Sequence, residues 1–382
     1  MLDRRPRVKS IYPVYKVKGD VFRVGAQLGI TTQFRDPENQ LWTMIGLMDG
    51  ARSIPEVTDC MLQRYPHLSR QDVLDGIDRL DKAGLLEHGE DSDYDEERNP
   101  LHRYIGNVNY FTHFLRLTDS RSQFQDKLAA ARVCLLGLGG AGSNILKLLV
   151  GLGVGEIRAV DYDRVEISNL NRQFFYSEAD IGRLKTEAAA RTVSQMNSCV
   201  KLETINQKLT SSDQIADLIR GSDLVISTID EPHFLALRRV NRACVKERIK
   251  CLFGVMQITR GRVFSIDPFQ SGCFDCLNVH YHKIDPLFVD QFRGFHESNF
   301  KHQHIAFGPD IYVLCGRMAN EAARIITGHM EPFSFGKQVE IDFKTGKSYV
   351  LRTWPRYPEE CPTCGSGTED QWPAFSFYEE PL

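Results

Sequence analysis

The sequence contains no long apolar segment. No apolar run approaches the roughly 18 residues that a membrane-spanning helix needs. The opening residues, Met1 to Pro6, lack the apolar core of a secretory signal. We therefore expect a cytoplasmic protein without a membrane partner. In that compartment the ten cysteines are expected to be metal ligands or buried thiols, because disulfides are rare there.

The sequence also lacks a strong excess of charge, an internal repeat and a low-complexity tract. Its formal net charge is −3 over 382 residues, which gives no electrostatic reason to expect a nucleic-acid partner. Apolar residues make up 42% and charged residues 25% of the chain, as in ordinary soluble globular proteins. The length is sufficient for two domains.

The first 90 residues predict a small separate domain. Two strand patterns precede three helical patterns, at 11–17 and 21–24, then at 39–48, 53–64 and 69–83. Ser53 with Glu56 is typical of a capping box at a helix start. A further strand is expected after Gly84, so the order favours a winged-helix module. The third helix mixes acidic and basic residues, which argues against DNA binding.

An acidic segment follows this domain. Its six carboxylates belong to Glu90, Asp91, Asp93, Asp95, Glu96 and Glu97. We interpret 91–120 as an acidic linker and lead-in segment, and we expect a helix over 121–131. A larger domain is then predicted at 121–366, with a C-terminal tail at 367–382.

From Val133 onward, apolar strand patterns alternate with helical patterns. Strands are predicted at 133–136, 157–160, 201–205, 223–228, 251–254 and 262–266. Helices are predicted at 142–151, 183–196, 211–219 and 233–247. This alternation is typical of an α/β fold with a doubly wound, mostly parallel sheet.

A glycine-rich turn follows the first of these strands. Its glycines, Gly137, Gly139, Gly140 and Gly142, let the backbone bring N–H groups against a phosphate at a helix N-terminus. Asp161 lies about 20 residues beyond the turn, where an acid can accept hydrogen bonds from ribose hydroxyls. These residues alone are compatible with NAD, FAD or ATP.

Arg172, Lys185 and Asp230 favour ATP cleavage over the alternatives. Splitting ATP into AMP and pyrophosphate places charge on the leaving group, which cations stabilise. A carboxylate at a strand end can hold Mg²⁺ against the phosphates. An NAD-dependent oxidoreductase would leave these three residues without a role.

Residues 98–366 resemble the ThiF/MoeB/ubiquitin-activating family of ATP-dependent carboxylate adenylyltransferases, which implies a Rossmann-like ThiF fold. The matching motifs are GxGGxGS at 137–143, DxD at 161–163, SNLNRQ at 168–173, GRLKTE around Lys185 and STID at 227–230. The resemblance implies that Asp161 and Asp163 help bind ATP, that Arg172 and Lys185 bind its phosphates and that Asp230 binds Mg²⁺. It also implies that Asn169 and Gln173 position the α-phosphate or the acyl carboxylate, and that the chain forms a homodimer.

Two CxxC pairs predict a structural zinc site. Cys273 with Cys276 and Cys361 with Cys364 can each present two thiolates, and together they complete a tetrahedral site with no open position. The alternatives are paired redox thiols or buried cysteines. Related adenylyltransferases carry the same two motifs.

The sequence departs from the family in three places. Residues 277–309 contain no cysteine, and Cys244, Cys251 and Cys315 lie in apolar patterns, so we expect no obligatory thioester. An arginine motif used across the family's dimer interface is reduced here to Arg103. The segment 280–304 carries five histidines, at 280, 282, 296, 302 and 304, and is expected to be a solvated loop over the active site.

The front domain resembles a RiPP recognition element, which binds a leader peptide by strand addition. With the adenylation motifs, this favours an enzyme of the microcin C or pantocin type that activates a peptide carboxylate. Two alternatives stay open. One is an enzyme that activates a sulfur-carrier or ubiquitin-like protein. The other is a non-catalytic partner that presents a leader peptide to a cyclodehydratase.

Overall fold

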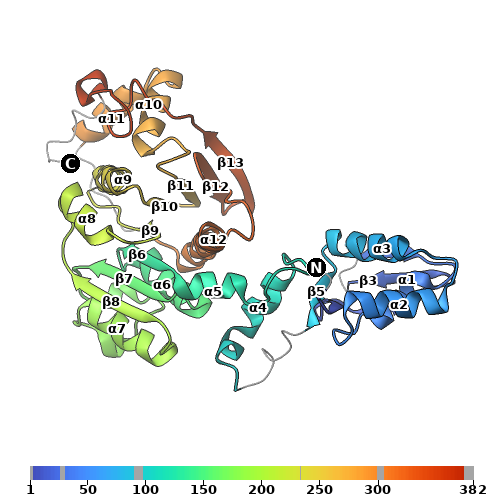
Figure 1. Ribbon diagram of the computed structural model, residues 1–382. Coiled ribbons are helices and arrows are strands. Elements are labelled where there is room, and N and C mark those ends of the chain that lie inside the picture. The colour runs from blue at the N-terminus through green and yellow to red at the C-terminus, as the bar shows by residue number, and fades with distance from the viewer. Residues whose placement is uncertain (1–2, 26–30, 90–97, 233, 299–304, 374–382) are drawn as a thin grey trace. The chain divides into compact units, whose positions relative to one another are not determined.

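The computed structural model describes residues 3–25, 31–89, 98–232, 234–298 and 305–373. It contains two compact units, Met1–Asp126 and Lys127–Leu382, which we call the front unit and the sheet unit (Figure 1). None of the described helices has the length and apolar character needed to cross a bilayer. The six acids of the predicted linker, His302, His304 and most of the predicted tail lie outside the described residues.

The front unit contains a three-stranded antiparallel sheet and three helices. The strands are β2 (Val14–Lys16), β3 (Val21–Val24) and β4 (Thr32–Arg35), and the helices are α1 (Gln40–Leu47), α2 (Ile54–Arg64) and α3 (Arg70–Lys82). The predicted capping box is present, because Ser53 accepts a hydrogen bond from the N–H of Glu56. Ser69 and Asp72 form a second box at α3. The apolar faces of the helices pack over β3 to form the core of the unit.

The strand expected after Gly84 is β5 (Leu86–His88). It pairs antiparallel with β1 (Pro6–Val8), near the start of the chain. The next elements, η2 (Pro100–Tyr104) and α4 (Ile105–Thr112), also belong to the front unit. Lys9 Nζ donates to the carbonyls of His113 and Leu115 at 3.2 and 2.7 Å. The segment after the acidic stretch therefore packs against the N-terminal part of the front unit.

The sheet unit is built on an eight-stranded sheet, counted over the described residues, in the order β13-β12-β11-β10-β9-β6-β7-β8. The strands are β6 (Arg132–Leu136), β7 (Glu156–Asp161), β8 (Lys201–Asn206), β9 (Leu224–Ser227), β10 (Lys250–Gln257), β11 (Arg260–Ile266), β12 (Lys337–Asp342) and β13 (Lys347–Thr353). The five strands from β10 to β8 pair in parallel. The rest of the sheet is antiparallel. The predicted mostly parallel α/β fold is confirmed.

Helices connect the parallel strands, as the sequence predicts. They are α6 (Gly140–Leu152), α7 (Lys185–Met196), α8 (Ser212–Ile219) and α9 (Leu235–Glu247), with α5 (Gln123–Ala130) leading into β6 (Figure 1). A long helix, α12 (Gly308–Thr327), packs against α6 and β10. Short 3₁₀ turns are η3 (Ile167–Asn169), η4 (Glu178–Asp180) and η5 (Glu369–Gln371).

The expectation of a solvated loop over 280–304 is wrong for the residues of this segment that the structure describes. Two helices, α10 (Phe274–Ile284) and α11 (Phe288–Glu297), occupy this region. The N-terminal half of α10 is buried, and the ring of Tyr281 stacks on Phe288 at a centroid distance of 5.4 Å. This packing stabilises helix where the histidine-rich composition indicates a solvated loop. His280 and His282 therefore lie on a helix.

Candidate nucleotide site and four-cysteine centre

The glycine turn lies where the strand order of the sheet reverses. Strand β6 pairs with β7 on one side and with β9 on the other, and ligands of open α/β sheets bind at such switch points. Gly137 has φ of 95°, a conformation that favours glycine. A Cβ on Gly142 would lie 2.0 Å from the carbonyl oxygen of Gly137. Both positions therefore require glycine to form a tight turn.

The N-terminus of α6 opens directly from this turn. Gly139 is the N-cap and has no side chain with which to satisfy the first N–H groups of the helix. A Cβ on Gly139 would meet no atom within 4 Å. Open space at an uncapped helix N-terminus fits a phosphate group.

Asp161 ties the glycine turn to the end of β7. Its Oδ2 accepts from the N–H of Leu138 at 2.6 Å, and its Oδ1 accepts from the N–H of Asp163 at 2.7 Å. Tyr176 Oη donates to the Leu138 carbonyl at 2.9 Å, while burial, followed by the Asp161 charge, raises the pKa of this phenol. Each carboxylate oxygen can accept a second bond, so Asp161 fits a ribose hydroxyl as well.

Arg172 lies beside the glycine turn. A Cβ on Gly140 would be 3.6 Å from Arg172 Cδ. Arg172 Nη1 donates to the Ser168 carbonyl at 2.7 Å and to Asn171 Oδ1 at 3.0 Å. A guanidinium has five N–H donors, so the same side chain can also bind a phosphate.

Asn144 joins the two segments. Its Nδ2 donates to the carbonyls of Gly140 and Arg172 at 2.7 and 2.8 Å. The sequence gives no signal of this residue's role, because its position one turn into α6 does not indicate a contact 28 residues away.

Lys185 is the first residue of α7 and forms an ion pair with Asp163. Its Nζ lies 2.8 Å from Asp163 Oδ2, with the lysine side chain 6% exposed. The backbone N–H of Lys185 also donates to the Asp163 carbonyl at 2.9 Å. The predicted cation is therefore held in place by the second acid of the DxD motif.

Asn169 and Gln173 lie in different environments. Asn169 Oδ1 accepts from the N–H of Glu166 at 3.1 Å, which caps η3. Gln173 is 2% exposed, and its Oε1 has no hydrogen-bond partner among the described residues. Since buried polar atoms are nearly always satisfied, Gln173 fits a role toward a bound group better than Asn169 does.

Asp230 follows β9, the strand beside the glycine turn, and is exposed. Thr228, two residues earlier, anchors this strand end by donating to the Leu136 carbonyl at 3.0 Å. A carboxylate here fits a hydrated Mg²⁺ ion. Arg103 lies in η2 of the front unit and is exposed; its role stays a prediction.

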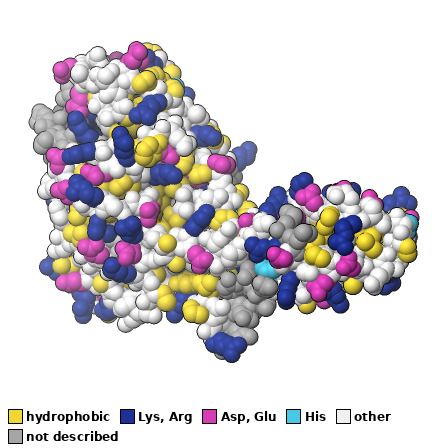
Figure 2. Space-filling model, viewed as in Figure 1, with side chains coloured by type: hydrophobic (Ala, Val, Ile, Leu, Met, Phe, Trp, Pro, Cys, Tyr) yellow, Lys and Arg dark blue, Asp and Glu magenta, His cyan; other side chains and the backbone are white. Residues whose placement is uncertain are grey.

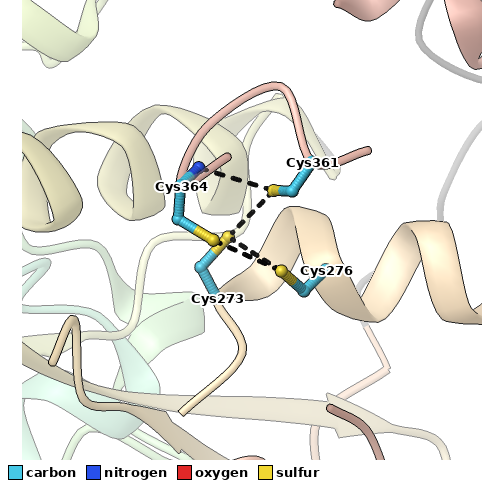
Figure 3. A group of neighbouring side chains, drawn as sticks. All are labelled: Cys273, Cys276, Cys361 and Cys364. Carbon is cyan, nitrogen blue, oxygen red and sulfur yellow. Dashed lines mark hydrogen bonds between the residues drawn. The ribbon is translucent and has the colours of Figure 1, made fainter. Parts of the chain in front are cut away.

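The four predicted zinc ligands come together. Their sulfur atoms all lie within 4.8 Å of one another, and Figure 3 shows the two pairs pointing toward a common centre. The closest pairs are Cys276–Cys364 at 3.3 Å, Cys273–Cys361 at 3.5 Å and Cys273–Cys276 at 3.9 Å. A tetrahedron with zinc–sulfur bonds of 2.3 Å has edges of about 3.8 Å, so this donor set fits zinc.

A buried ion pair supports the cysteine cluster. Arg238 of α9 binds Asp275 through two hydrogen bonds of 3.0 Å, and both side chains are 1% exposed. Thr363 Oγ1 donates to the same carboxylate at 2.7 Å. The sequence gives no signal of this network, because neither Arg238 nor Asp275 belongs to a recognisable motif of charged residues.

The three cysteines that lie in apolar sequence patterns, and that we do not expect to form a thioester, are buried. Cys244, Cys251 and Cys315 have no exposed surface. Burial raises the pKa of Cys315 to about 12 and raises that of Cys251. Cys315 Sγ also contacts the carbonyl of Ala141 at 3.4 Å. The prediction that Cys315 belongs to the core is confirmed.

A glycine turn at the switch point of a doubly wound sheet, with acids at the adjoining strand ends, defines an α/β protein of the nucleotide-binding class. The chain belongs to the ThiF family, whose model matches residues 112–363.

Curated relatives match most of the sheet unit. The sulfur carrier protein ThiS adenylyltransferase of Escherichia coli strain K12 is 27% identical over 256 residues, which are 66% of this chain and 94% of that protein. The sulfur carrier protein adenylyltransferase of Thermus thermophilus is 35% identical over 250 residues, which are 63% and 84% of the two chains.

Solved structures match more of the chain at lower identity. E. coli MccB, crystallised with AMPCPP and MccA, superposes with a TM-score of 0.74 at 21% identity, over 94% of this chain and 99% of that one. PaaA superposes with a TM-score of 0.68 at 18% identity, over 91% and 99%. These likenesses establish the fold.

Proposed function

We propose that this chain is an ATP- and Mg²⁺-dependent adenylyltransferase that activates a peptide carboxylate as an acyl-adenylate in the biosynthesis of a ribosomal, bacteriocin-like peptide. The observation that carries the adenylation is the glycine turn with Asp161, Arg172 and the Asp163–Lys185 pair around it. Membership of the ThiF family and the adenylyltransferase names of its relatives support it.

The chemistry assigns a separate task to each part. The turn and Asp161 would hold the nucleotide, and Asp230 would hold Mg²⁺, which neutralises phosphate charge when bound. A carboxylate oxygen of the substrate attacks the α-phosphorus, and pyrophosphate leaves with the electron pair of the broken P–O bond. Arg172 and Lys185 would stabilise the charge that develops on the phosphates.

The proposal of a peptide substrate is supported by how much of the chain superposes on a solved structure. MccB superposes on 94% of this chain, so the likeness extends into the front unit, whereas the sulfur-carrier relatives match 63–66%. The sheet β2-β3-β4 has two edge strands, and β4 is mostly exposed. An extended leader peptide could add to such an edge.

Direct attack on the acyl-adenylate, without a thioester, completes the proposal. A nucleophilic cysteine needs an accessible, electropositive environment. Cys244, Cys251 and Cys315 are buried among apolar groups, which supports attack by a small nucleophile or by a nitrogen of the substrate itself.

Thermal unfolding of the full chain with ATP, ATP plus Mg²⁺, and NAD tests the nucleotide assignment without a known substrate. A ligand at 100 times its dissociation constant stabilises by about 2.7 kcal/mol, and the ATP shift should grow with Mg²⁺ only if Asp230 is present. Asp230→Asn should lose the Mg²⁺ increment, with Asp213→Asn as the surface control. No shift with any nucleotide would favour the peptide-presenting scaffold, and a shift with NAD alone would contradict the assignment.

Activation of a sulfur-carrier or ubiquitin-like protein is the second candidate. It is favoured by the identity of 27–35% to sulfur-carrier adenylyltransferases. Deletion of residues 1–90, which keeps Arg103 and the whole matched segment 112–363, separates the two candidates. Peptide adenylation should be lost in this variant, whereas carrier adenylation should survive.

A further inference from the structure

One face of α9 is bound to the two residues between Cys273 and Cys276. The Phe234 ring contacts the Phe274 ring at a centroid distance of 5.5 Å. One turn further, Arg238 forms its two 3.0 Å hydrogen bonds with Asp275. Asn241 Oδ1 then accepts from the N–H of Phe274 at 2.8 Å. Because positions 234, 238 and 241 follow helical spacing, these contacts fix the rotation of α9 about its axis and its position along that axis.

A short stretch of chain connects Asp230 to the start of α9. This residue lies between the end of β9 at Ser227 and the start of α9 at Leu235. Phe234, the N-cap of α9, has φ of 66°, a conformation that costs free energy for a residue with a side chain. Such a conformation persists only where the surrounding contacts determine it, and the ring of Phe274 supplies one of them.

The Cys273–Cys276 turn is in turn held by the second cysteine pair. Thr363, between Cys361 and Cys364, donates to the carboxylate of Asp275 that also binds Arg238. Trp354 Nε1 donates to the Cys273 carbonyl at 3.0 Å. Asp275 is therefore shared by α9, the first cysteine turn and the second.

We propose that the four-cysteine centre positions the Asp230 segment through Arg238, so that loss of the centre weakens divalent-cation binding at the nucleotide site. Arg238 acts as a positioning residue: it does not touch the nucleotide, and it transmits the geometry of the cysteine turns to the first two turns of α9. The inference rests on the proposed function, which makes Asp230 the ligand of the cation.

The test compares two affinities of the full, metal-loaded chain. The first is the affinity for Mn²⁺ in the presence of ATP, read as free Mn²⁺ by electron paramagnetic resonance. The second is the affinity for ATP in buffer without added divalent cation and without a chelator. Arg238→Lys keeps the charge and loses the paired geometry, and Thr363→Val removes one bond to Asp275 while leaving the ion pair intact. Lys246→Arg is the matched control, since Lys246 lies on the same helix, is 59% exposed and pairs with Asp213, which is not a partner of Arg238, at 2.8 Å.

Arg238→Lys should weaken Mn²⁺ binding about tenfold, the scale of coupling carried by packed side-chain networks, and leave ATP binding without a divalent cation unchanged. Thr363→Val should weaken Mn²⁺ binding in the same direction, which keeps the proposal testable if Arg238→Lys does not fold. Unchanged Mn²⁺ affinity in both variants, or equal loss of both affinities, would overturn the proposal.

A readout that needs no nucleotide separates this inference from the proposed function. Hydrogen exchange of residues 224–241 is measured before and after the metal is removed with a chelator. Faster exchange in this segment, with that of β7 and β8 unchanged, supports the positioning role, and equal exchange before and after removal overturns it. A wild-type chain without affinity for ATP would contradict the proposed function alone.

Discussion

Single side chains at the nucleotide end of the sheet are held in place by the protein itself. Lys185, which would be costly to bury alone, has its charge compensated by Asp163 at 2.8 Å. The side chain therefore loses little further rotational freedom when a phosphate binds beside it, which favours tight and specific binding.

Asp163→Asn should consequently weaken ATP binding by about tenfold, because Lys185 then loses the partner that orients it. Isothermal titration with ATP and Mg²⁺ measures the change. The matched control is Asp213→Asn, which breaks an ion pair of the same 2.8 Å length to Lys246 on the exposed surface of α8 and α9. Equal affinities for Asp163→Asn and the wild type would refute the orienting role.

Lys9 makes the stability of the front unit increase with pH in the alkaline range. Burial lowers the pKa of this lysine from 10.5 to about 8, against the raising effect of Glu87. Between these values the unfolded chain binds more protons than the folded one, so stability rises with pH from about 8 to 10.5, by at most about 3 kcal/mol. Denaturant unfolding of the wild type and Lys9→Met across this range measures it. The variant should lose that pH-dependent gain, and an equal gain in both proteins would contradict the assignment.

Residues within motifs could be predicted from the sequence, because their spacing alone carries the signal. The glycines, Asp161, Lys185 and the four cysteines are of this kind. Asn144, Arg238 and Thr363 could not be predicted, since their roles depend on partners 28 to 88 residues away. Hydrogen bonds between remote segments leave no periodic pattern in the chain.

Among the elements, strands with an apolar run were predicted, including antiparallel β3 and β11, whereas β4, β12 and β13 were not. Continuous apolar runs mark β6, β7 and β9. Strand β13 is exposed along most of its length, so its sequence lacks this signal. The helices α10 and α11 were missed because aromatic stacking and the cysteine cluster stabilise them, and neither is a local property of the histidine-rich sequence.

The glycine turn gives a prediction at this scale. Gly142→Ala places a Cβ 2.0 Å from the Gly137 carbonyl oxygen, so the turn must move, at a cost of about 3 kcal/mol. Gly151→Ala, near the other end of α6 with no atom within 4 Å of the new Cβ, should stabilise by about 0.5–1 kcal/mol. Urea unfolding of both variants measures this difference. A Gly142→Ala variant as stable as Gly151→Ala would show that the turn is not tight.

At the scale of the whole molecule, the face shown in Figure 2 carries acidic and basic side chains interspersed with one another. The cysteine cluster is a specific restraint between remote parts of the chain. Cys273 and Cys361 are 88 residues apart, and the segment between them contains α12, β12 and β13. Closing this loop restricts the unfolded chain as a covalent cross-link does.

Replacing Cys361 and Cys364 together by serine should abolish zinc binding and lower the stability of the sheet unit by about 4 kcal/mol, or roughly 10 °C in melting temperature. Mass spectrometry should find one zinc per wild-type chain and none in the double variant. The control is Cys199→Ser, an exposed cysteine outside the cluster. An unchanged melting temperature after complete loss of metal would contradict a structural zinc.

The 88-residue separation of Cys273 and Cys361 also has a consequence for synthesis. A ribosome that adds about 5–20 residues per second delivers the first cysteine pair roughly 4–18 seconds before the second. During that interval the nascent chain carries an open dithiol, and the parallel strands have already left the exit tunnel without the clasp that later joins α9 to the C-terminal segment. The dithiol is open to oxidation during these seconds, and a zinc ion bound by the completed set of four cysteines would end that exposure.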